Sequence, residues 1–456
     1  MRIDVDLDLV RKYDQPGPRY TSYPTAPHFT EAFSASDWES AVVANNLAAD
    51  RQVSLYFHFP FCDTLCWFCG CTTVITRRRD RIDEYVDHLF REIDLYAARM
   101  HPDRQVVQIH FGGGTPTHLT PDQIRAVGAK IHSAFNVAPD AEISCEMDPR
   151  GLTRDHVVAL HEAGFNRASI GVQDFEPKVQ KAINRVHGPE MIAEIIGWMR
   201  ETGFQSINLD LIYGLPLQTL PSFGETLETI LSFGADRLAV FSYAHVPWLK
   251  PHMKLIREDD LPAPSEKLEM LKLVIETLTQ RDYEYVGMDH FARSDDELAI
   301  AQAAGTLQRN FQGYSTRAGA DIYALGMSSI SQLPRCYAQA TKELPAYYEA
   351  MNDGRLPIIK GVTLTDDDVV RRHVIMRVMC DMGIDFEGMS KSLGVDFSER
   401  FESSLSQLNE FEHDGLIERT ATGLTITPQG RLFVRNIAMH FDAYLANSAQ
   451  QFSRTV

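Results

Sequence analysis

The 456-residue sequence lacks several features that would point to a common class of protein. It has no run of about 18 apolar residues, the length a helix needs to cross the hydrocarbon core of a membrane. It has 44 Lys and Arg against 62 Asp and Glu, which gives a formal net charge of -18 at pH 7. General nucleic-acid binders and membrane-surface binders need a cationic surface. We therefore expect neither nucleic acid nor a membrane as a partner.

The first residues also lack the apolar run of a secretory leader. The segment "MRIDVDLDLVRKYD" carries acidic residues where such a leader is hydrophobic, so we expect a cytoplasmic protein. With 44% apolar residues and modest Gly and Pro, the composition is that of a globular protein. The length predicts one large domain with one or two smaller ones. No segment indicates a subunit interface, so a monomer is the default expectation.

Cysteine is scarce, yet four of the seven cysteines lie within ten residues, at Cys62, Cys66, Cys69 and Cys71. An odd total in a reducing compartment does not suit a disulfide framework. Three thiolates on one loop, spaced CxxxCxxC, suit a 4Fe-4S cluster whose fourth iron stays open to a ligand. A structural zinc site usually takes two short pairs of ligands separated by a longer stretch. The spacing favours iron-sulfur, while zinc and unligated core thiols stay open as alternatives.

A glycine run follows a second apolar segment. In "VVQIHFGGGTPTHLTPDQ", Gly112, Gly113 and Gly114 precede a helix start with Thr120 as N-cap and Pro121 at the first helical position. Glycines let the backbone approach a bound group closely. By itself this pattern is equally typical of a tight connection between a strand and a helix.

The apolar pattern predicts an α/β fold. Six strand-like segments alternate with helical patterns, and the helix that begins near Arg81 repeats its apolar residues on one face. The predicted strands are 53–59, 106–111, 141–147, 167–173, 207–213 and 238–244, with a further strand at 285–288. Such alternation implies right-handed βαβ units, here a partial (β/α)6 TIM-like barrel.

This architecture predicts where the chemistry lies, because active sites of parallel α/β barrels form at the carboxyl ends of the strands. The cysteine loop follows the first predicted strand and the glycines follow the second. Glu146 and Gln173 end the third and fourth predicted strands, Asp210 lies on the fifth, and Ala244 ends the sixth. We expect these residues to meet on one rim.

Three parts are predicted along the chain: an N-terminal segment (1–50) that contacts the active site, the catalytic barrel (51–360), and a C-terminal domain (361–456). The last part shows helical patterns at 366–379, 386–392 and 397–413, then strand, turn, strand and helix. This winged-helix-like order raises a rival function, a DNA-binding iron-sulfur regulator. The region has more acidic than basic residues, which disfavours phosphate binding, so a structural cover of the barrel is preferred.

Together the motifs resemble a known family. CxxxCxxC followed by GGGTP is similar to the radical S-adenosylmethionine (SAM) superfamily. The likeness is closest to the oxygen-independent coproporphyrinogen III oxidases, and it extends over essentially the whole chain. The segments that carry it are "GPRYTSYPTA" (17–26), "CWFCGC" (66–71), "EMDPR" (146–150), "FNRASIGVQDF" (165–175), "NLDLIYGLPLQT" (208–219), "YAHVP" (243–247), "GMDHFAR" (287–293) and "RNFQGYST" (309–316).

The resemblance implies a set of cofactor contacts. The cluster ligands would be Cys62, Cys66 and Cys69, while Cys71 is a nearby thiol that is not a ligand. The cluster-bound SAM would contact Tyr56, Gly112, Glu146 and Ile330, of which Tyr56 and Glu146 are the catalytic candidates. A second SAM would contact Phe68, Gly113, Gly114, Gln173, Arg185, Asp210 and Ala244. An electron-donor protein such as a flavodoxin or ferredoxin would reduce the cluster.

The substrate implied is coproporphyrinogen III, a tetrapyrrole with four carboxylates. A 5'-deoxyadenosyl radical would take a hydrogen from the β carbon of a propionate. Loss of carbon dioxide and one electron would then leave a vinyl group, and two such steps give protoporphyrinogen IX in haem biosynthesis. Arg19, with Tyr20 and Tyr23, is the candidate partner for the carboxylates. The arginines of 77–81 are a further candidate, or a solvated helix start.

Relatives that act as haem chaperones or methyltransferases share the cysteine and barrel motifs. The segment "GPRYTSYPTA" and Cys71 are typical of the decarboxylating enzymes and favour them over these relatives.

Overall fold

The computed structural model describes residues 2–48, 50–445 and 452–455. Its contacts divide the chain into two compact units. One, called here the barrel unit, comprises Phe29–Lys267 and Gly319–Thr363; the other, the terminal unit, comprises Met1–His28, Leu268–Ala318 and Leu364–Val456. This division does not follow chain order, and the functional boundaries near residues 50 and 360 stay a prediction.

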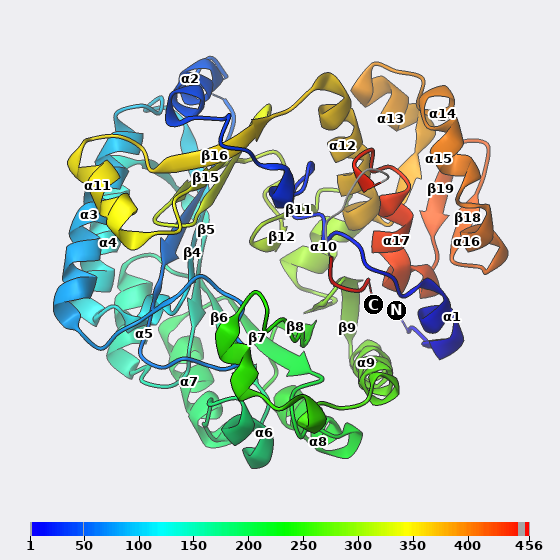
Figure 1. Cartoon of the computed structure of the whole chain (residues 1–456), viewed down its shortest axis with the longest axis horizontal. Helices are drawn as coiled ribbons and strands as arrows, with labels where there is room; N and C mark the ends of the chain where they lie inside the picture. The colour runs from blue at the N-terminus through cyan, green and yellow to red at the C-terminus, as the bar shows by residue number, and fades with distance from the viewer. Residues whose placement is uncertain (1, 49, 446–451, 456) are drawn as a thin grey trace. The chain divides into compact units, whose positions relative to one another are not determined.

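The barrel unit is built on a curved sheet whose central strands are parallel and follow one another in chain order (Figure 1). These strands are β1 (Val53–Phe59), β4 (Gln105–Gly113), β5 (Asn136–Met147), β6 (Arg167–Gln173), β7 (Ser206–Tyr213) and β8 (Arg237–Ser242). All six predicted strands are confirmed. The differences are at the ends, since Gly112 and Gly113 belong to β4, and Ala244 lies two residues beyond β8.

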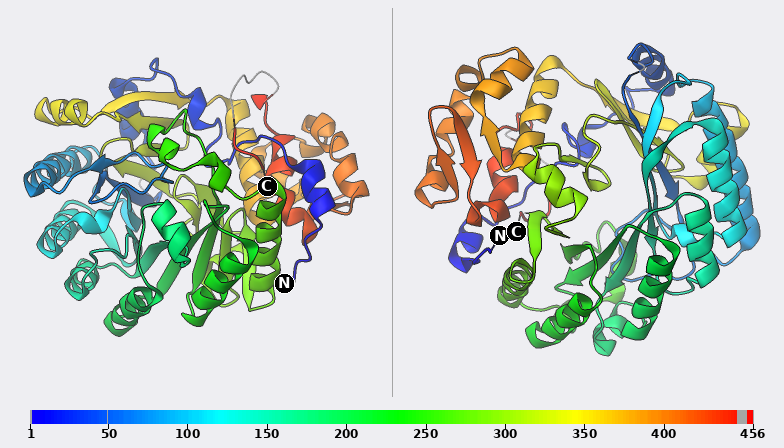
Figure 2. Two further views of the ribbon diagram at one scale, coloured as in Figure 1. Left: turned by 60° about the horizontal axis from the view of Figure 1, so that its bottom comes forward. Right: turned by 180° about the vertical axis from the view of Figure 1, so that it is seen from behind.

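Helices connect these strands and lie along one side of the sheet (Figure 2). They are α3 (Arg79–Ala97), α4 (Pro121–Ala134), α5 (Arg154–Glu162), α6 (Pro177–Ala182), α7 (Pro189–Thr202) and α8 (Leu220–Ser232). Helix α3 buries Ile82, Tyr85 and Ile93 as its pattern predicts. Helix α4 has the predicted start, because the Thr120 side chain accepts from the Gln123 N–H in a capping box and Pro121 is the first residue.

The sheet continues beyond β1 in a way that the sequence analysis did not predict. Strand β13 (Asp321–Leu325) pairs with β1 in parallel, and β14 (Ile330–Leu333), β15 (Cys336–Ala340) and β16 (Ile358–Thr363) extend the sheet antiparallel. Helices α2 (Ala35–Asn45) and α11 (Leu344–Asn352) belong to the same unit. Short strands β2 (Phe61–Cys62) and β3 (Val74–Ile75) pair with each other in parallel.

The terminal unit is mostly helical, as predicted for its C-terminal part. Its first half contains α1 (Leu7–Tyr13), most of α9 (Pro264–Thr279), β9 (Tyr283–Gly287), β10 (His290–Arg293), α10 (Glu297–Ala303), β11 (Gln308–Asn310) and β12 (Gly313–Ser315). Its second half contains α12 (Asp366–Asp381), β17 (Gly383–Asp385), α13 (Phe386–Leu393), α14 (Phe397–Arg400), α15 (Glu402–Ser406), α16 (Asn409–His413), β18 (Ile417–Arg419), β19 (Gly423–Ile426) and α17 (Val434–Met439). Strands β17, β19 and β18 form a small antiparallel sheet.

One helix prediction in this unit is wrong. Residues 397–413 were expected to form a single helix, but the structure has three short ones, α14, α15 and α16. The backbone leaves helical geometry at Phe401 (φ -110°, ψ 18°) and at Leu408 (φ -85°, ψ 2°). Both side chains are buried, so burying them outweighs the local helical pattern. The predicted strand at 285–288 corresponds to β9, which pairs antiparallel with β10.

Among the described residues, no helix combines the length and the apolar character that crossing a membrane requires.

Candidate functional site

The four clustered cysteines lie on a loop that is closed at its base. Cys62 is the last residue of β2, and it pairs with Ile75 of β3; Cys66, Cys69 and Cys71 lie between the two strands. The Val74 N–H donates to the Pro60 carbonyl at 2.7 Å. The loop thus leaves the carboxyl end of β1 and returns beside it, as predicted for a loop on the barrel rim.

The thiols of the loop are free to act as metal ligands. All seven cysteines are free, and among the residues that the structure describes no three His, Cys, Asp or Glu side chains are grouped as ligands of a single metal ion. In a 4Fe-4S cluster each thiolate binds a different iron, and three thiols on one loop fit that demand.

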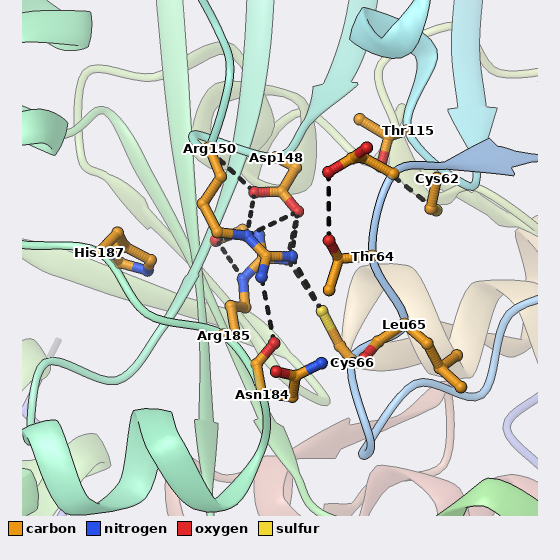
Figure 3. A network of polar contacts seen from close by, with 12 residues as sticks. Cys62, Thr64, Leu65, Cys66, Thr115, Asp148, Arg150, Asn184, Arg185 and His187 are labelled. Carbon is orange, nitrogen blue, oxygen red and sulfur yellow. Dashed lines mark hydrogen bonds and ion pairs between the residues drawn. The ribbon is translucent and has the colours of Figure 1, made fainter. Parts of the chain in front are cut away.

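Each cysteine of the CxxxCxxC motif receives a hydrogen bond at its sulfur. The Thr115 hydroxyl donates to Cys62 Sγ at 3.3 Å, and the Cys71 N–H donates to Cys69 Sγ at 3.4 Å. Cys66 Sγ is contacted by two guanidinium groups (Figure 3). Burial raises the pKa of the Cys62 thiol to about 12, so in the absence of a metal this thiol is protonated.

The glycine run approaches Glu146 closely. The Gly113 N–H donates to Glu146 Oε2 at 3.0 Å, and His110 Nε2 is bonded to Glu146 Oε1 at 3.2 Å. A Cβ at Gly112 would lie 3.0 Å from the Glu146 carboxyl carbon, and Gly113 has φ +114°, which favours glycine. Burial would raise the pKa of Glu146, but the His110 contact and the Gly113 N–H outweigh it, so the pKa lies below its ordinary value. The site therefore holds an ionised carboxylate.

Tyr56 belongs to the same group. Its ring stacks on the His110 ring with centroids 5.8 Å apart, and its hydroxyl is 3.1 Å from His58 Nδ1. His58 Nε2 is in turn bonded to the Thr72 carbonyl of the cysteine loop at 3.1 Å. The structure thus brings Tyr56, Gly112, Gly113 and Glu146 together beside the loop.

A second group surrounds Arg185, which is 6% exposed. Its guanidinium donates to the Gly171 carbonyl, and a Cβ at Gly171 would meet both Gln173 Nε2 and Arg185 Nη2. Gln173 itself has φ +72°, a conformation that a non-glycine residue rarely adopts. The structure thus brings Gln173 and Arg185 together at the end of β6.

Asp210 lies on the neighbouring strand β7. It accepts hydrogen bonds from Asn208 Nδ2 at 2.7 Å and from the Ser169 hydroxyl at 3.2 Å. Burial raises the pKa of Asp210 to about 7, so this carboxyl can hold or release a proton near neutrality.

The remaining predicted cofactor contacts are apolar or small. Phe68 packs, with Trp67, against a buried apolar cluster formed by Val179, Ile183, Ile212, Leu215, Tyr243 and Ile256. A Cβ at Gly114 would lie 2.7 Å from the Pro60 carbonyl, so the backbone at this glycine packs directly against the start of the cysteine loop. Ala244 is exposed just beyond β8, and Ile330 is the first residue of β14.

The predicted substrate residues lie in the terminal unit, and two of them are fully buried. The Tyr20 hydroxyl donates to Asp442 Oδ2 at 2.9 Å, and the Tyr23 hydroxyl accepts from the Ala443 N–H at 3.0 Å. The Arg19 side chain forms an ion pair with Asp289 and is 41% exposed. Of the three, only Arg19 presents accessible surface to an anion.

Three of the four arginines of 77–81 have partners. Arg77 pairs with Asp63 at 2.8 Å, Arg78 pairs with Asp80, and Arg79 donates to the His118 carbonyl at 2.7 Å. These contacts are largely exposed, as in a solvated helix start.

The sequence analysis missed several polar residues around the cysteine loop, among them Arg150, which contacts Cys66, and Asp148, which holds Arg150. Asp148 and Arg150 lie just after β5, and they were quoted only as part of the motif "EMDPR". Their charge directly beyond a strand end was the available signal. Lys250 Nζ donates to the Cys71 carbonyl at 2.8 Å, and His252 Nε2 is bonded to the Cys69 carbonyl at 2.9 Å. No sequence pattern marks these last two.

Comparison with known proteins agrees with this geometry. Residues 56–230 match the radical SAM superfamily, and residues 364–433 match the HemN C-terminal domain. The chain is 45% identical to an oxygen-independent coproporphyrinogen III oxidase of Salmonella typhimurium over 457 residues, which covers 100% of this chain and 99% of the relative. The relative of the same name from Synechocystis is 43% identical over 100% of this chain and 98% of its own length.

A solved structure is also similar. Coproporphyrinogen III oxidase (HemN) from Escherichia coli, described as a radical SAM enzyme, superposes with a TM-score of 0.92 at 43% identity, covering 98% of this chain and 100% of that one. Membership of the radical SAM superfamily implies a 4Fe-4S cluster and SAM, which the three free thiols fit. The chain belongs to the oxygen-independent coproporphyrinogen III oxidase family of the radical SAM superfamily.

Proposed function

We propose that this enzyme converts coproporphyrinogen III to protoporphyrinogen IX without oxygen, by oxidative decarboxylation of two propionate side chains to vinyl groups. The observation that carries the proposal is the identity of 42–45% with curated relatives of that name along the whole chain. The cysteine loop supports it, since its three sulfurs are free and each receives a hydrogen bond. When bound, the reduced cluster would supply the electron that releases a 5'-deoxyadenosyl radical from SAM, and this radical would take a hydrogen from the substrate.

Cys62, Cys66 and Cys69 would hold the cluster, and the group around Glu146 would hold the cluster-bound SAM. An ionised carboxylate suits the ammonium group or the ribose hydroxyls of SAM. The lowered pKa of Glu146 supports this role. Tyr56, which stacks on His110, would close the same pocket, together with Gly112 and Ile330.

A second SAM would lie against Arg185, Gln173 and Asp210, with Phe68, Gly113, Gly114 and Ala244. A buried arginine suits the carboxylate of its methionine moiety. Asp210 can offer either a carboxylate or a protonated carboxyl to the ribose near neutral pH, since its pKa is about 7. Equilibrium binding of SAM to the reconstituted protein tests this proposal, with Arg185→Met expected to lower the number of molecules bound per chain.

For the substrate, we assign a carboxylate contact to Arg19, whose guanidinium is partly exposed. Replacing Arg19 with Met removes a charged hydrogen bond worth about 1.5–3 kcal/mol. The KM for coproporphyrinogen III should rise roughly tenfold or more while radical formation persists. Arg154→Met, on an exposed surface arginine of the barrel unit, is the matched control. Equal KM values in the two variants would contradict the assignment.

The physiological setting is also part of the proposal: a monomer in the cytoplasm, reduced by a flavodoxin or ferredoxin. Seven free thiols fit a reducing compartment. Anaerobic turnover of coproporphyrinogen III, with detection of protoporphyrinogen IX, tests the function itself. Haem transfer or methyl transfer in place of this product would support a chaperone or a methyltransferase and would contradict the proposal.

A further inference from the structure

Cys66 differs from the other cysteines of the loop because its sulfur faces two cations. Arg150 Nη2 lies 3.2 Å from Cys66 Sγ, and Arg185 Nη1 lies 3.5 Å from it (Figure 3). Donors that carry a charge form stronger hydrogen bonds than neutral ones, especially to an anion such as a thiolate. Among the contacts that the structure describes, Cys66 is the predicted ligand whose sulfur is hydrogen-bonded by guanidinium groups.

Asp148 orients both arginines. Its Oδ2 accepts from Arg150 Nη2 at 2.7 Å and from Arg185 Nη1 at 2.8 Å, and its Oδ1 accepts from Arg150 Nε at 3.0 Å. The Arg150 guanidinium is thus held in a two-point contact, with one edge on the carboxylate and one N–H directed at the sulfur. Two cations share one carboxylate, so the group keeps a net positive charge.

Arg150 also ties the cysteine loop to the rest of the rim. Its Nη1 donates to the Asn184 carbonyl at 3.1 Å, and Asn184 Nδ2 donates to the Leu65 carbonyl at 2.8 Å. On the other side of Cys66, the Trp67 N–H donates to the Ile183 carbonyl at 3.0 Å. The residues flanking Cys66 are therefore fixed to the segment after α6, and Arg150 bridges that segment to the end of β5.

We propose that Arg150, oriented by Asp148, is a positioning residue for Cys66 that raises the reduction potential of the cluster. The inference rests on the proposed cluster site and adds two residues to it. Reduction adds an electron to a group that three thiolates already make negative. Hydrogen bonds to the sulfurs and nearby charge set the potential of iron-sulfur clusters, and a guanidinium at Cys66 favours the reduced state.

The test measures the cluster and not the reaction. The full chain is reconstituted anaerobically with iron and sulfide, bound iron is counted, and the midpoint potential is obtained from a dithionite titration followed by electron paramagnetic resonance, without SAM or porphyrinogen. Arg150→Met should keep the iron content and shift the potential to more negative values. Arg150→Lys, which keeps the charge but not the two-point contact, should shift it less in the same direction.

Asp148→Asn should shift the midpoint potential in the direction opposite to Arg150→Met. The difference separates an effect of charge from a general disturbance of the site. The substitution removes a negative charge beside the arginines, while the amide oxygen can still accept from Arg150 and keep it oriented, and the potential should shift to more positive values. Arg154→Met is the matched control, since Arg154 is an exposed arginine of α5 that pairs with Glu201, and it should leave the potential unchanged.

Unchanged potentials in both Arg150 variants, with normal iron, would overturn the inference. So would shifts of the same sign in Arg150→Met and Asp148→Asn. If Arg150→Met binds no iron, Arg150→Lys and Asp148→Asn decide the question. A wild-type chain that binds no cluster overturns the proposed function, and this inference with it, whereas a normal wild-type cluster with unshifted variants overturns this inference alone.

Discussion

Cysteine and glutamate side chains occur both on the rim of the barrel unit and in its buried interior. Their surroundings in the two places are opposite. On the rim, Cys66 faces two arginines and Glu146 faces His110 and a main-chain N–H. In the interior, Cys145 donates to the Glu146 carbonyl from a fully buried position. Buried Glu92 of α3 accepts from the Gly326 N–H and the Tyr347 hydroxyl.

The pKa shifts of these side chains also differ between the rim and the interior. Burial dominates at Glu92 and raises its pKa to about 7, whereas the contacts of Glu146 lower its pKa in spite of burial. Burial also raises the pKa of the Cys145 thiol. The comparison teaches that the residue type alone does not mark a functional group. At Glu146 the His110 contact and the Gly113 N–H outweigh burial and keep the carboxyl ionised, whereas at Glu92 burial outweighs the two donors.

The largest expected difference is between two cysteine substitutions. Cys66→Ser should abolish bound iron and activity, because a serine hydroxyl stays protonated and is a poor iron ligand. Cys145→Ser should keep both and cost about 1–2 kcal/mol of stability, since the hydroxyl can donate to the same carbonyl. Iron analysis and anaerobic assay of both variants check this. Loss of the cluster in Cys145→Ser would contradict the distinction between rim and interior cysteines.

The next largest difference is expected in the affinity for SAM, between variants of Glu146 and Glu92. Glu146→Gln removes the charge that His110 and the Gly113 N–H stabilise, and the affinity for SAM should fall roughly 10–100-fold, as expected for losing a hydrogen bond to a charged group worth about 1.5–3 kcal/mol. Glu92→Gln should leave SAM binding unchanged. Binding is measured on reconstituted protein with equal iron content. Equal affinities in the two variants would show that Glu146 does not contact SAM.

Glu92 also predicts a pH dependence of stability. Its pKa rises from 4.5 to about 7 on folding, so the folded chain holds this proton more tightly than the unfolded chain. The contribution is fully present below pH 4.5 and is lost as the pH rises towards 7, by at most about 1.4 kcal/mol per pH unit. Relative to Glu92→Gln, the wild-type cluster-free protein should lose about 2 kcal/mol of stability between pH 5 and pH 7. Parallel stability profiles of the two proteins would refute the assignment.

The smallest effect is expected at Cys71, which lies on the rim without being a proposed ligand. Its contact with Cys69 Sγ includes its main-chain N–H, and a substitution preserves this donor. Cys71→Ser should therefore retain the iron content of the wild type. Loss of the cluster in this variant would refute a three-cysteine site and would place Cys71 among the ligands.

Much of the fold follows from local pattern. Strands β1 and β6 are almost wholly buried, and they were predicted with the bounds that they have. Strands β14 and β15 escaped prediction because they are short and carry polar residues such as Ser331 and Gln339, which are buried by pairing within the sheet. The breaks at Phe401 and Leu408 depend on packing that helical periodicity does not describe.

The site residues that could be predicted are those that belong to a sequence motif or lie at the end of a strand. Glu146 and Gln173 follow from the rule that chemistry lies at the carboxyl ends of parallel strands, whereas Asp210 lies within β7 and was named from the family resemblance. The contact of Arg150 with Cys66 joins residues 84 positions apart, and such a pairing depends on side-chain direction. The burial of Tyr20 and Tyr23 was equally invisible, because their partners lie more than 400 residues away.

The central claim is that radical formation at the cysteine loop is coupled to decarboxylation of a porphyrinogen. The most direct test incubates the anaerobically reconstituted and reduced enzyme with SAM, with and without coproporphyrinogen III, and measures 5'-deoxyadenosine and carbon dioxide in the same samples. The account predicts matched amounts of both products that depend on the porphyrinogen. Deoxyadenosine without carbon dioxide, or neither product from an intact cluster, would contradict it.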